Sequence, residues 1–118
     1  MQNLQTAQDF SNGAFEKCFD KLTEQSIWQT YGEQTLVGAQ EIIPFCKQVR
    51  AYFDSVETIF TTKNTLVDGN SIAIRGTAQF RRDGKLVSEI DSCDVYEFDE
   101  AGNIVRIDSY CIKAHIRN

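Results

Sequence analysis

Apolar and polar residues alternate along the second half of the chain, from about residue 55 to residue 113. Alternate residues of a β-strand point to the same face of the sheet, so this period predicts strands. Turn-forming residues separate the alternating runs at Asp68-Gly69-Asn70, Asp83-Gly84 and Asp99-Glu100-Ala101-Gly102. The pattern therefore predicts a four-stranded antiparallel meander over residues 55–67, 71–82, 85–98 and 103–113.

The first half of the chain has the spacing of amphipathic helices. Apolar side chains recur at i, i+3, i+4 and i+7 in the set Phe15, Cys18, Phe19 and Leu22. An earlier helical segment with Leu4, Ala7 and Phe10 is expected to end at Ser11-Asn12-Gly13. Helices followed by strands predict one α+β domain over residues 1–118.

Between these two regions, a short strand is expected over residues 26–31, ending at Gly32. A further helix is expected from about Ala39, after Gly38. Its broad apolar face comprises Ile42, Ile43, Cys46, Val49 and Phe53. Pro44 is expected in the first turn, where a missing backbone N–H costs no helical hydrogen bond.

A carboxylate interrupts the apolar face of the strand predicted over 85–98. That face comprises Leu86, Ser88, Ile90, Ser92, Asp94, Tyr96 and Phe98, whereas the opposite face is more highly charged. Asp94 is therefore expected to point inward. A buried carboxylate costs several kcal/mol unless it is protonated, paired or hydrogen-bonded, and such positions are candidate functional sites.

The turn lengths give an expected register for the meander. A three-residue loop, Arg82-Asp83-Gly84, with Gly84 in the left-handed conformation, would align the apolar faces and set Arg75 opposite Asp91. A four-residue loop over 99–102 would set Asp94 beside Ile107 and Ser92 beside Ser109. The last strand would then face inward with Val105, Ile107, Ser109 and Cys111.

The expected inner face has small or polar residues in the middle of three neighbouring strands: Gly76, Ala78, Ser92, Asp94, Ser109 and Cys111. Well-packed interiors contain few voids, so such a cluster indicates either a closely seated helix or a cavity. A helix packed closely on this face would not explain the presence of a carboxylate at position 94. We therefore favour an apolar pocket with a few polar groups, the usual form of a ligand site.

Composition narrows the possible partners. The chain has 118 residues, is 42% hydrophobic and 25% charged, and carries a net charge of −5. This charge argues against nucleic acid or an anionic membrane as partner, and the N-terminus lacks a secretory pattern, which favours a cytoplasmic protein. No cofactor or metal is expected, because Cys18, Cys46, Cys93 and Cys111 are widely spaced and His115 is the only histidine.

The chain resembles the nuclear transport factor 2-like superfamily, closest to its SnoaL-like, polyketide-cyclase-like and ketosteroid-isomerase-like branches. The resemblance lies in an ordered set of segments: the Asn12-Gly13 break, the strand and turn over 26–32, Gly38-x-x-x-Ile42-x-x-Phe45, and the hairpin over 94–105. It implies a cone-shaped, cystatin-like α+β fold, in which a curved, mainly antiparallel sheet wraps N-terminal helices around one pocket. It also implies a homodimer formed through the outer face of the sheet.

Only some of the catalytic residues of these relatives have a counterpart in this sequence. Ketosteroid isomerase uses an Asp base and an oxyanion hole made from a Tyr and a protonated Asp. The protonated Asp would fall at Asp94, but the base falls at Gln29 and no tyrosine lies near Leu4 or Gln5. The Arg and second Asp of the related epoxide hydrolases would fall at Ser92 and Ser109. Neither activity is expected by its usual mechanism.

Three functional hypotheses remain open. The first is a SnoaL-like enzyme, of the isomerase or cyclase type, that transfers a proton through Asp94 on a small apolar, carbonyl-containing substrate. The second is a non-catalytic protein that binds a small molecule in the same pocket, and the third is an oligomerisation or adaptor domain. For the first two, the expected ligand-binding residues are Gln29, Tyr31, Phe53, Gly76, Ala78, Ser92, Ile107, Ser109 and Cys111.

Overall fold

A computed structural model describes residues 2–114 of the chain. The helical segments are α1 (Gln2–Ser11), the 3₁₀ helix η1 (Phe15–Lys21) and α2 (Ala39–Ser55). The strands are β1 (Leu22–Thr30), β2 (Gln34–Val37), β3 (Glu57–Asp68), β4 (Ser71–Arg82), β5 (Lys85–Phe98) and β6 (Ile104–Lys113). The ends of β4 and β5 coincide with the predicted strand ends, because both strands are bounded by turn residues.

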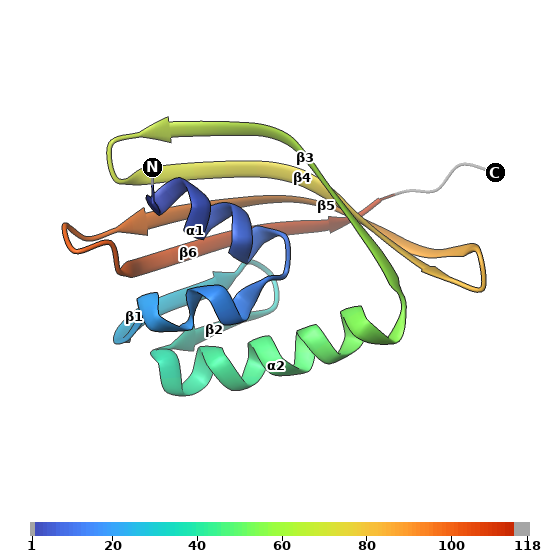
Figure 1. The fold of residues 1–118 in the computed structure, drawn as a ribbon, viewed down its shortest axis with the longest axis horizontal. Helices are drawn as coiled ribbons and strands as arrows, with labels where there is room; N and C mark the ends of the chain where they lie inside the picture. The colour runs from blue at the N-terminus through green and yellow to red at the C-terminus, as the bar shows by residue number, and fades with distance from the viewer. Residues whose placement is uncertain (1, 115–118) are drawn as a thin grey trace.

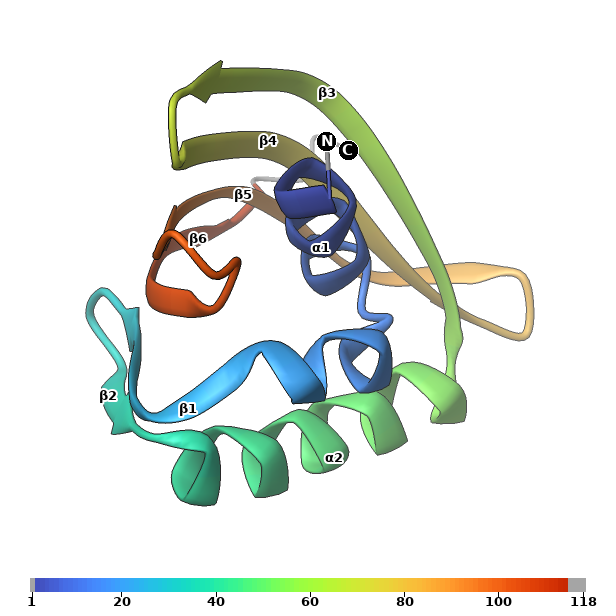
Figure 2. The same ribbon diagram turned by 60° about the vertical axis from the view of Figure 1, so that its left-hand side comes forward.

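The six strands form one sheet in the order β2-β1-β6-β5-β4-β3. All neighbouring pairs are antiparallel except β1 and β6, which run parallel. The sheet curls around α1, and α2 lies along β1 and β2 (Figures 1 and 2). The predicted α+β fold, with N-terminal helices on a curved and mainly antiparallel sheet, is confirmed.

Three bulges bend the long strands. Lys63 in β3, Val87 in β5 and Val105 in β6 are each an extra residue between paired neighbours. A bulge increases local twist and bends its strand, which is how an open sheet acquires strong curvature. The β3–β4 bulge also lies beside a close backbone approach, since a Cβ added at Gly76 would lie 2.6 Å from the carbonyl oxygen of Thr61.

The predicted register of β4 and β5 is wrong by two residues. The turn has two residues, Asp83 and Gly84, with φ of 53° and 77°, and the bulge at Val87 adds one further position. The outer-face pairs are therefore Arg75 with Cys93 and Thr77 with Asp91, rather than Arg75 with Asp91. From Ser88 onward the predicted inner and outer faces are unchanged, because a shift of two preserves facing. Leu86, before the bulge, pairs with Arg81 of the outer face, so its expected inward direction is wrong.

The register of β5 and β6 differs from the prediction for the same reason. The bulge at Val105 turns Ile104 inward and leaves Val105 on the exposed side, so the inward direction expected for Val105 is wrong. Asp94 pairs with Ser109 instead of Ile107, and Ser92 pairs with Cys111. The carboxylate therefore has a hydroxyl as its cross-strand neighbour.

The structure of the N-terminal half differs from the prediction in three details. The predicted helix over 15–22 is a 3₁₀ helix, and Leu22 already begins β1, which is longer than the expected strand. β2 was not predicted. Pro44 is the sixth residue of α2 rather than a first-turn residue, so it removes the amide that would bond to the carbonyl of Gln40. Pro44 is exposed, where water can solvate that carbonyl.

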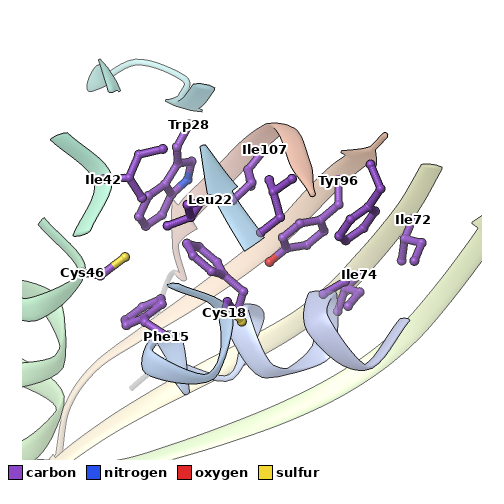
Figure 3. Packing of buried hydrophobic residues seen from close by; sticks show 14 residues of the cluster. Phe15, Cys18, Leu22, Trp28, Ile42, Cys46, Ile72, Ile74, Tyr96 and Ile107 are labelled. Carbon is purple, nitrogen blue, oxygen red and sulfur yellow. The ribbon is translucent and has the colours of Figure 1, made fainter. Parts of the chain in front are cut away.

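The core lies between the sheet and the helical segments (Figure 3). Tyr96, Ile107 and Ile104 from β5 and β6 are fully buried, as are Ile42 and Cys46 from α2. Trp28, Phe15 and Tyr96 gather where these elements meet. The core packs one end of the cone and leaves the other end of the inner face open to a cavity.

Candidate functional site

A cavity of about 260 Å³ lies between the inner face of the sheet and the helices. Its walls are dominated by aromatic side chains from six elements, α1, η1, β1, α2, β3 and β4. These side chains are Phe10, Phe15, Trp28, Phe45, Phe53, Phe60 and Phe80. Polar groups come from Ser11, Thr30, Glu33, Gln34, Ser92, Asp94, Ser109 and Cys111. This composition is that of a small-molecule pocket with a few polar groups.

The aromatic walls are held by mutual packing. Phe10 makes edge contacts with Phe15 and Trp28, with both pairs of ring centroids 4.9 Å apart. Phe53 of α2 stacks on Phe80 of β4, with centroids 5.6 Å apart. Because helix and sheet both contribute rings to these pairs, the walls of the cavity are fixed by the same contacts that dock α1 and α2.

Asp94 forms the polar inner end of the cavity. It lies in the middle of β5, between Ile74 of β4 and Ser109 of β6. Protein surrounds the carboxyl on nearly all sides, yet the residue keeps some accessible surface because it lines the cavity. A ligand in the cavity would therefore meet this carboxyl directly.

Two chains of hydrogen bonds lead to Asp94. Ser11 Oγ lies 2.9 Å from Asp94 Oδ2 and 2.6 Å from the Tyr96 hydroxyl. On the other side, Trp28 Nε1 donates to Ser109 Oγ at 2.9 Å. An indole N–H can only donate, so the Ser109 hydroxyl proton is free to point toward its cross-strand neighbour Asp94. Both chains can deliver an O–H donor to the carboxylate.

Burial raises the pKa of Asp94, and hydrogen bonds from Ser109 and Ser11 act in the opposite direction. Burial also raises the pKa of Tyr96 well above 10, with the nearby charge of Asp94 adding to the effect. Tyr96 therefore remains a neutral hydrogen-bond donor, while Asp94 is placed to change protonation state closer to neutrality than an ordinary aspartate.

A second, much smaller cavity lies beside Asp94. Its volume is about 40 Å³, and Ser11, Asn12, Gly76, Ser92 and Asp94 are among the residues that line it. This volume is sufficient for a water molecule, which needs roughly 10–15 Å³ and polar partners. Asp94 thus borders both the large aromatic cavity and this small one.

Six of the residues expected at the site line the large cavity together. They are Phe53, Ala78, Ser92, Asp94, Ser109 and Cys111. Gly76 lines only the smaller cavity, and Ile107 is fully buried in the core without lining either. The small residues in the middle of the strands therefore do border open space, as the pattern indicated.

The structure places Gln29 and Tyr31 on the outer face of the sheet, so their expected direction is wrong. Arg106 donates a hydrogen bond to Gln29 Oε1, and the Tyr31 ring stacks on Tyr110 at 4.5 Å. Trp28 occupies the inner face, because the largest aromatic residue of β1 packs against Phe10 in the core. Thr30, on the same face as Trp28, lines the cavity instead.

Several lining residues were not identified from the sequence as part of the site. Ser11 was interpreted only as part of a helix break, and Glu33 and Gln34 lie in or next to a turn before the unpredicted strand β2. Phe60 faces the cavity from β3. A serine at the end of a helix carries no local signal of such a role, because its partner Asp94 is 83 positions away.

The cysteines do not have the character of nucleophiles. Burial raises the pKa of Cys111 to about 11 and those of Cys18 and Cys46 to about 12. Within residues 2–114, no cluster of three His, Cys, Asp or Glu side chains could hold a metal ion. His115, the only histidine of the sequence, lies outside the described residues.

None of the helices in the described part of the chain is both long and apolar enough to cross a membrane.

No protein-family model matches the sequence, and no curated protein matches it either. Solved structures do match. An NTF2-like protein of unknown function from Cytophaga hutchinsonii is 28% identical, with a TM-score of 0.83 over 92% of this chain and 95% of that one.

Two further structures are similar in fold. A SnoaL-like polyketide cyclase candidate from Shewanella putrefaciens is 15% identical, with a TM-score of 0.72 over 94% of this chain and 90% of that one. A ketosteroid isomerase candidate from Kribbella flavida is 16% identical, with a TM-score of 0.74 over 99% and 82%. The chain thus has the nuclear transport factor 2-like fold, which it shares with these SnoaL-like and ketosteroid-isomerase-like structures.

Proposed function

We propose that this protein binds one small, largely apolar molecule in the 260 Å³ cavity and holds the polar group of that molecule at Asp94. The observation that supports this most directly is the position of the carboxyl. It lies at the inner end of an aromatic cavity and is hydrogen-bonded by hydroxyl groups. Asp94 and Glu33 are the two acidic residues that line the cavity.

The volume limits the size of the ligand. Pockets for drug-sized molecules usually measure about 300–1,000 Å³, so a cavity of about 260 Å³ suits a molecule with one ring or two small ones. Aromatic walls favour an apolar body. The hydroxyls of Thr30, Ser92 and Ser109 provide further hydrogen-bonding positions for one polar end.

Nuclear magnetic resonance with small neutral aromatic molecules would test the proposal. Trp28 is the only tryptophan, so its indole N–H gives a single resonance at the cavity wall. We expect binding to shift this resonance, and Ala78→Phe, which places a ring in the cavity, to abolish the shift. Ala73→Phe is the matched control, because Ala73 lies on the opposite face of β4. Ligand shifts confined to the outer face would contradict the proposal.

Proton transfer is a second candidate function, favoured by the raised pKa of the buried Asp94 carboxyl. Asp94 would remove a proton from the carbon next to a ketone and return it, as a general base and then a general acid. With Gln29 on the outer face, the enolate oxygen would be stabilised by neutral donors such as the hydroxyls of Thr30 and Ser92 and the amide of Gln34.

Deuterium exchange tests this candidate without knowledge of the substrate. A small aromatic ketone such as 4-phenyl-2-butanone in D₂O exchanges the protons beside its carbonyl when an enzyme enolises it. We expect the wild-type protein to accelerate that exchange and Asp94→Asn to remove the acceleration. Equal exchange by both proteins would exclude a role for Asp94 in proton transfer while leaving binding intact.

A further inference from the structure

The charges along the large cavity all have one sign. Asp94 lies at the inner end, Glu33 in the turn between β1 and β2, and among the described residues no lysine or arginine lines the cavity. The two ion pairs formed within residues 2–114 are Arg50 with Asp54 and Arg106 with Asp108. Neither involves a residue of the cavity.

The thiol of Cys111 lines the cavity together with both carboxylates, and their charges oppose its ionisation. Its pKa is raised to about 11, first by burial and then by the charges of Asp94 and Glu33. A thiol resists ionisation where the potential is negative. Among the described residues, Asp94 and Glu33 are the charged groups that line the cavity, so the potential between them is negative when Asp94 is ionised.

The aromatic walls add a second attraction for positive charge. Seven aromatic rings border the cavity, and one of them is the indole of Trp28. A cation within about 6 Å of a ring centroid is attracted by the ring, most strongly by tryptophan. Cavities of this composition can hold an ammonium group between rings and a carboxylate.

The carboxyl of Asp94 has acceptor positions to spare. An ionised carboxylate offers about four lone-pair sites. Ser11 occupies one on Oδ2, and the Ser109 hydroxyl is placed to occupy another. The remaining sites can accept N–H donors from a ligand, and an ammonium group supplies two or three of them. A ligand with its own carboxylate or phosphate would meet like charge here instead.

We propose that the small molecule bound in this cavity is a compact organic cation, an ammonium group on an apolar body, with its nitrogen held by Asp94. The proposal rests on the proposed binding function and names the chemical class of its ligand. The ammonium lies at the inner end of the cavity, against Asp94 and Trp28. The apolar body fills the space between Phe53, Phe60 and Phe80.

This assignment sets the sign of the pH dependence of binding. The groups that face Asp94 are Ser11 from α1, Tyr96 from β5, and Ser109 and Cys111 from β6, with Glu33 at the turn before β2. Tyr96 and Cys111 remain neutral below about pH 9, because their pKa values are raised. An amine binds the ionised form of Asp94, so its affinity rises with pH until Asp94 is ionised.

A matched set of ligands tests the proposal: 2-phenylethylamine, 2-phenylethanol and phenylacetate, which share a body and differ in charge. Binding is followed by the fluorescence of Trp28, the only tryptophan. We expect the amine to bind at least tenfold more tightly than the alcohol at pH 7.5, and its affinity to rise with pH from about 3.8 until Asp94 is ionised. We expect phenylacetate not to bind. Equal affinities for amine and alcohol would overturn the cation assignment and leave the binding function standing. No response to any of the three would overturn both.

Variants separate the two carboxylates. Glu33→Gln should weaken binding of the amine severalfold without affecting the alcohol, and Asp94→Asn should remove the preference for the amine. Glu24→Gln is the control, because Glu24 is an exposed carboxylate of β1 that does not line the cavity. Circular dichroism verifies that each variant folds. A preference for the amine that survives Asp94→Asn would overturn the proposal.

Discussion

The hydroxyl of Ser11, the last residue of α1, lies 2.9 Å from Asp94 Oδ2 and 2.6 Å from the hydroxyl of Tyr96. One side chain at the end of a helix thus satisfies two polar groups of β5. Tyr96 is fully buried, and Ser11 is its hydroxyl's hydrogen-bond partner in the described structure. The position of α1 and the polarity of the cavity are therefore linked.

Replacing Ser11 by alanine should lower the free energy of unfolding by about 1–3 kcal/mol, the cost of leaving a buried polar group unpaired. Urea denaturation measures this change. In a Tyr96→Phe background the same replacement should cost less, since one of the two unpaired groups is then absent. An identical loss in both backgrounds would show that the Tyr96 hydroxyl does not depend on Ser11.

The stability of the protein should fall as pH rises through the folded-state pKa of Asp94. Burial raises that pKa above 3.8, so the folded state holds a proton that the unfolded chain has released. The free energy of unfolding therefore decreases with pH in the window that begins near 3.8 and ends at the folded pKa. Urea denaturation between pH 4 and pH 8 measures it, and Asp94→Asn should flatten the curve across that window. A curve that retains the wild-type slope in Asp94→Asn would assign the effect to another group.

Cys111 should react slowly with iodoacetamide even though its residue surface is exposed. Its pKa of about 11 leaves little thiolate at pH 8, so we expect alkylation at least tenfold slower than that of a free cysteine. Peptide mass spectrometry after timed quenching measures the rate. Urea-unfolded protein is the control, and Cys111 should react there at the ordinary rate. Equal rates in folded and unfolded protein would contradict the raised pKa.

The outer face of the sheet is a candidate dimer interface. Tyr31 and Tyr110 stack on it, and Ile112 is 69% exposed. We expect a dimer by light scattering at tens of micromolar and a monomer after Ile112→Asp, because a charge in a desolvated interface is costly. Val67→Asp is the control that should leave the dimer intact, because Val67 is also exposed but pairs with Ile72 on the inner face of the sheet. A monomeric wild-type protein would contradict the prediction.

Strand boundaries and facing were predictable where residue types carry the information. Asp83-Gly84 and Asp99 to Gly102 are turn formers, and the alternation in β4 and β5 identified Asp94 as inward-facing. The alternation alone is therefore sufficient to predict that Asp94 points into the site.

The registers and the facing of β1 could not be predicted in the same way. The bulges fall at Val87 and Val105, and valine is an ordinary strand residue that gives no sign of an extra position. In β1, Ile27 and Trp28 are both apolar, so the pattern admits either face. Tertiary packing of Trp28 against Phe10 decides between them, and Gln29 follows to the outer face.

The bulges determine where the chain can change length without altering the cavity. Val105 has no partner in β5, because Glu97 pairs with Arg106 and Phe98 with Ile104. Deleting Val105 would leave Asp94 opposite Ser109, whereas deleting one residue from the turn over 99–103 would change the facing of β6 relative to β5. Val87 has the same property in β5. Among homologous chains of different length, deletions at these two valines are compatible with an unchanged set of residues around Asp94.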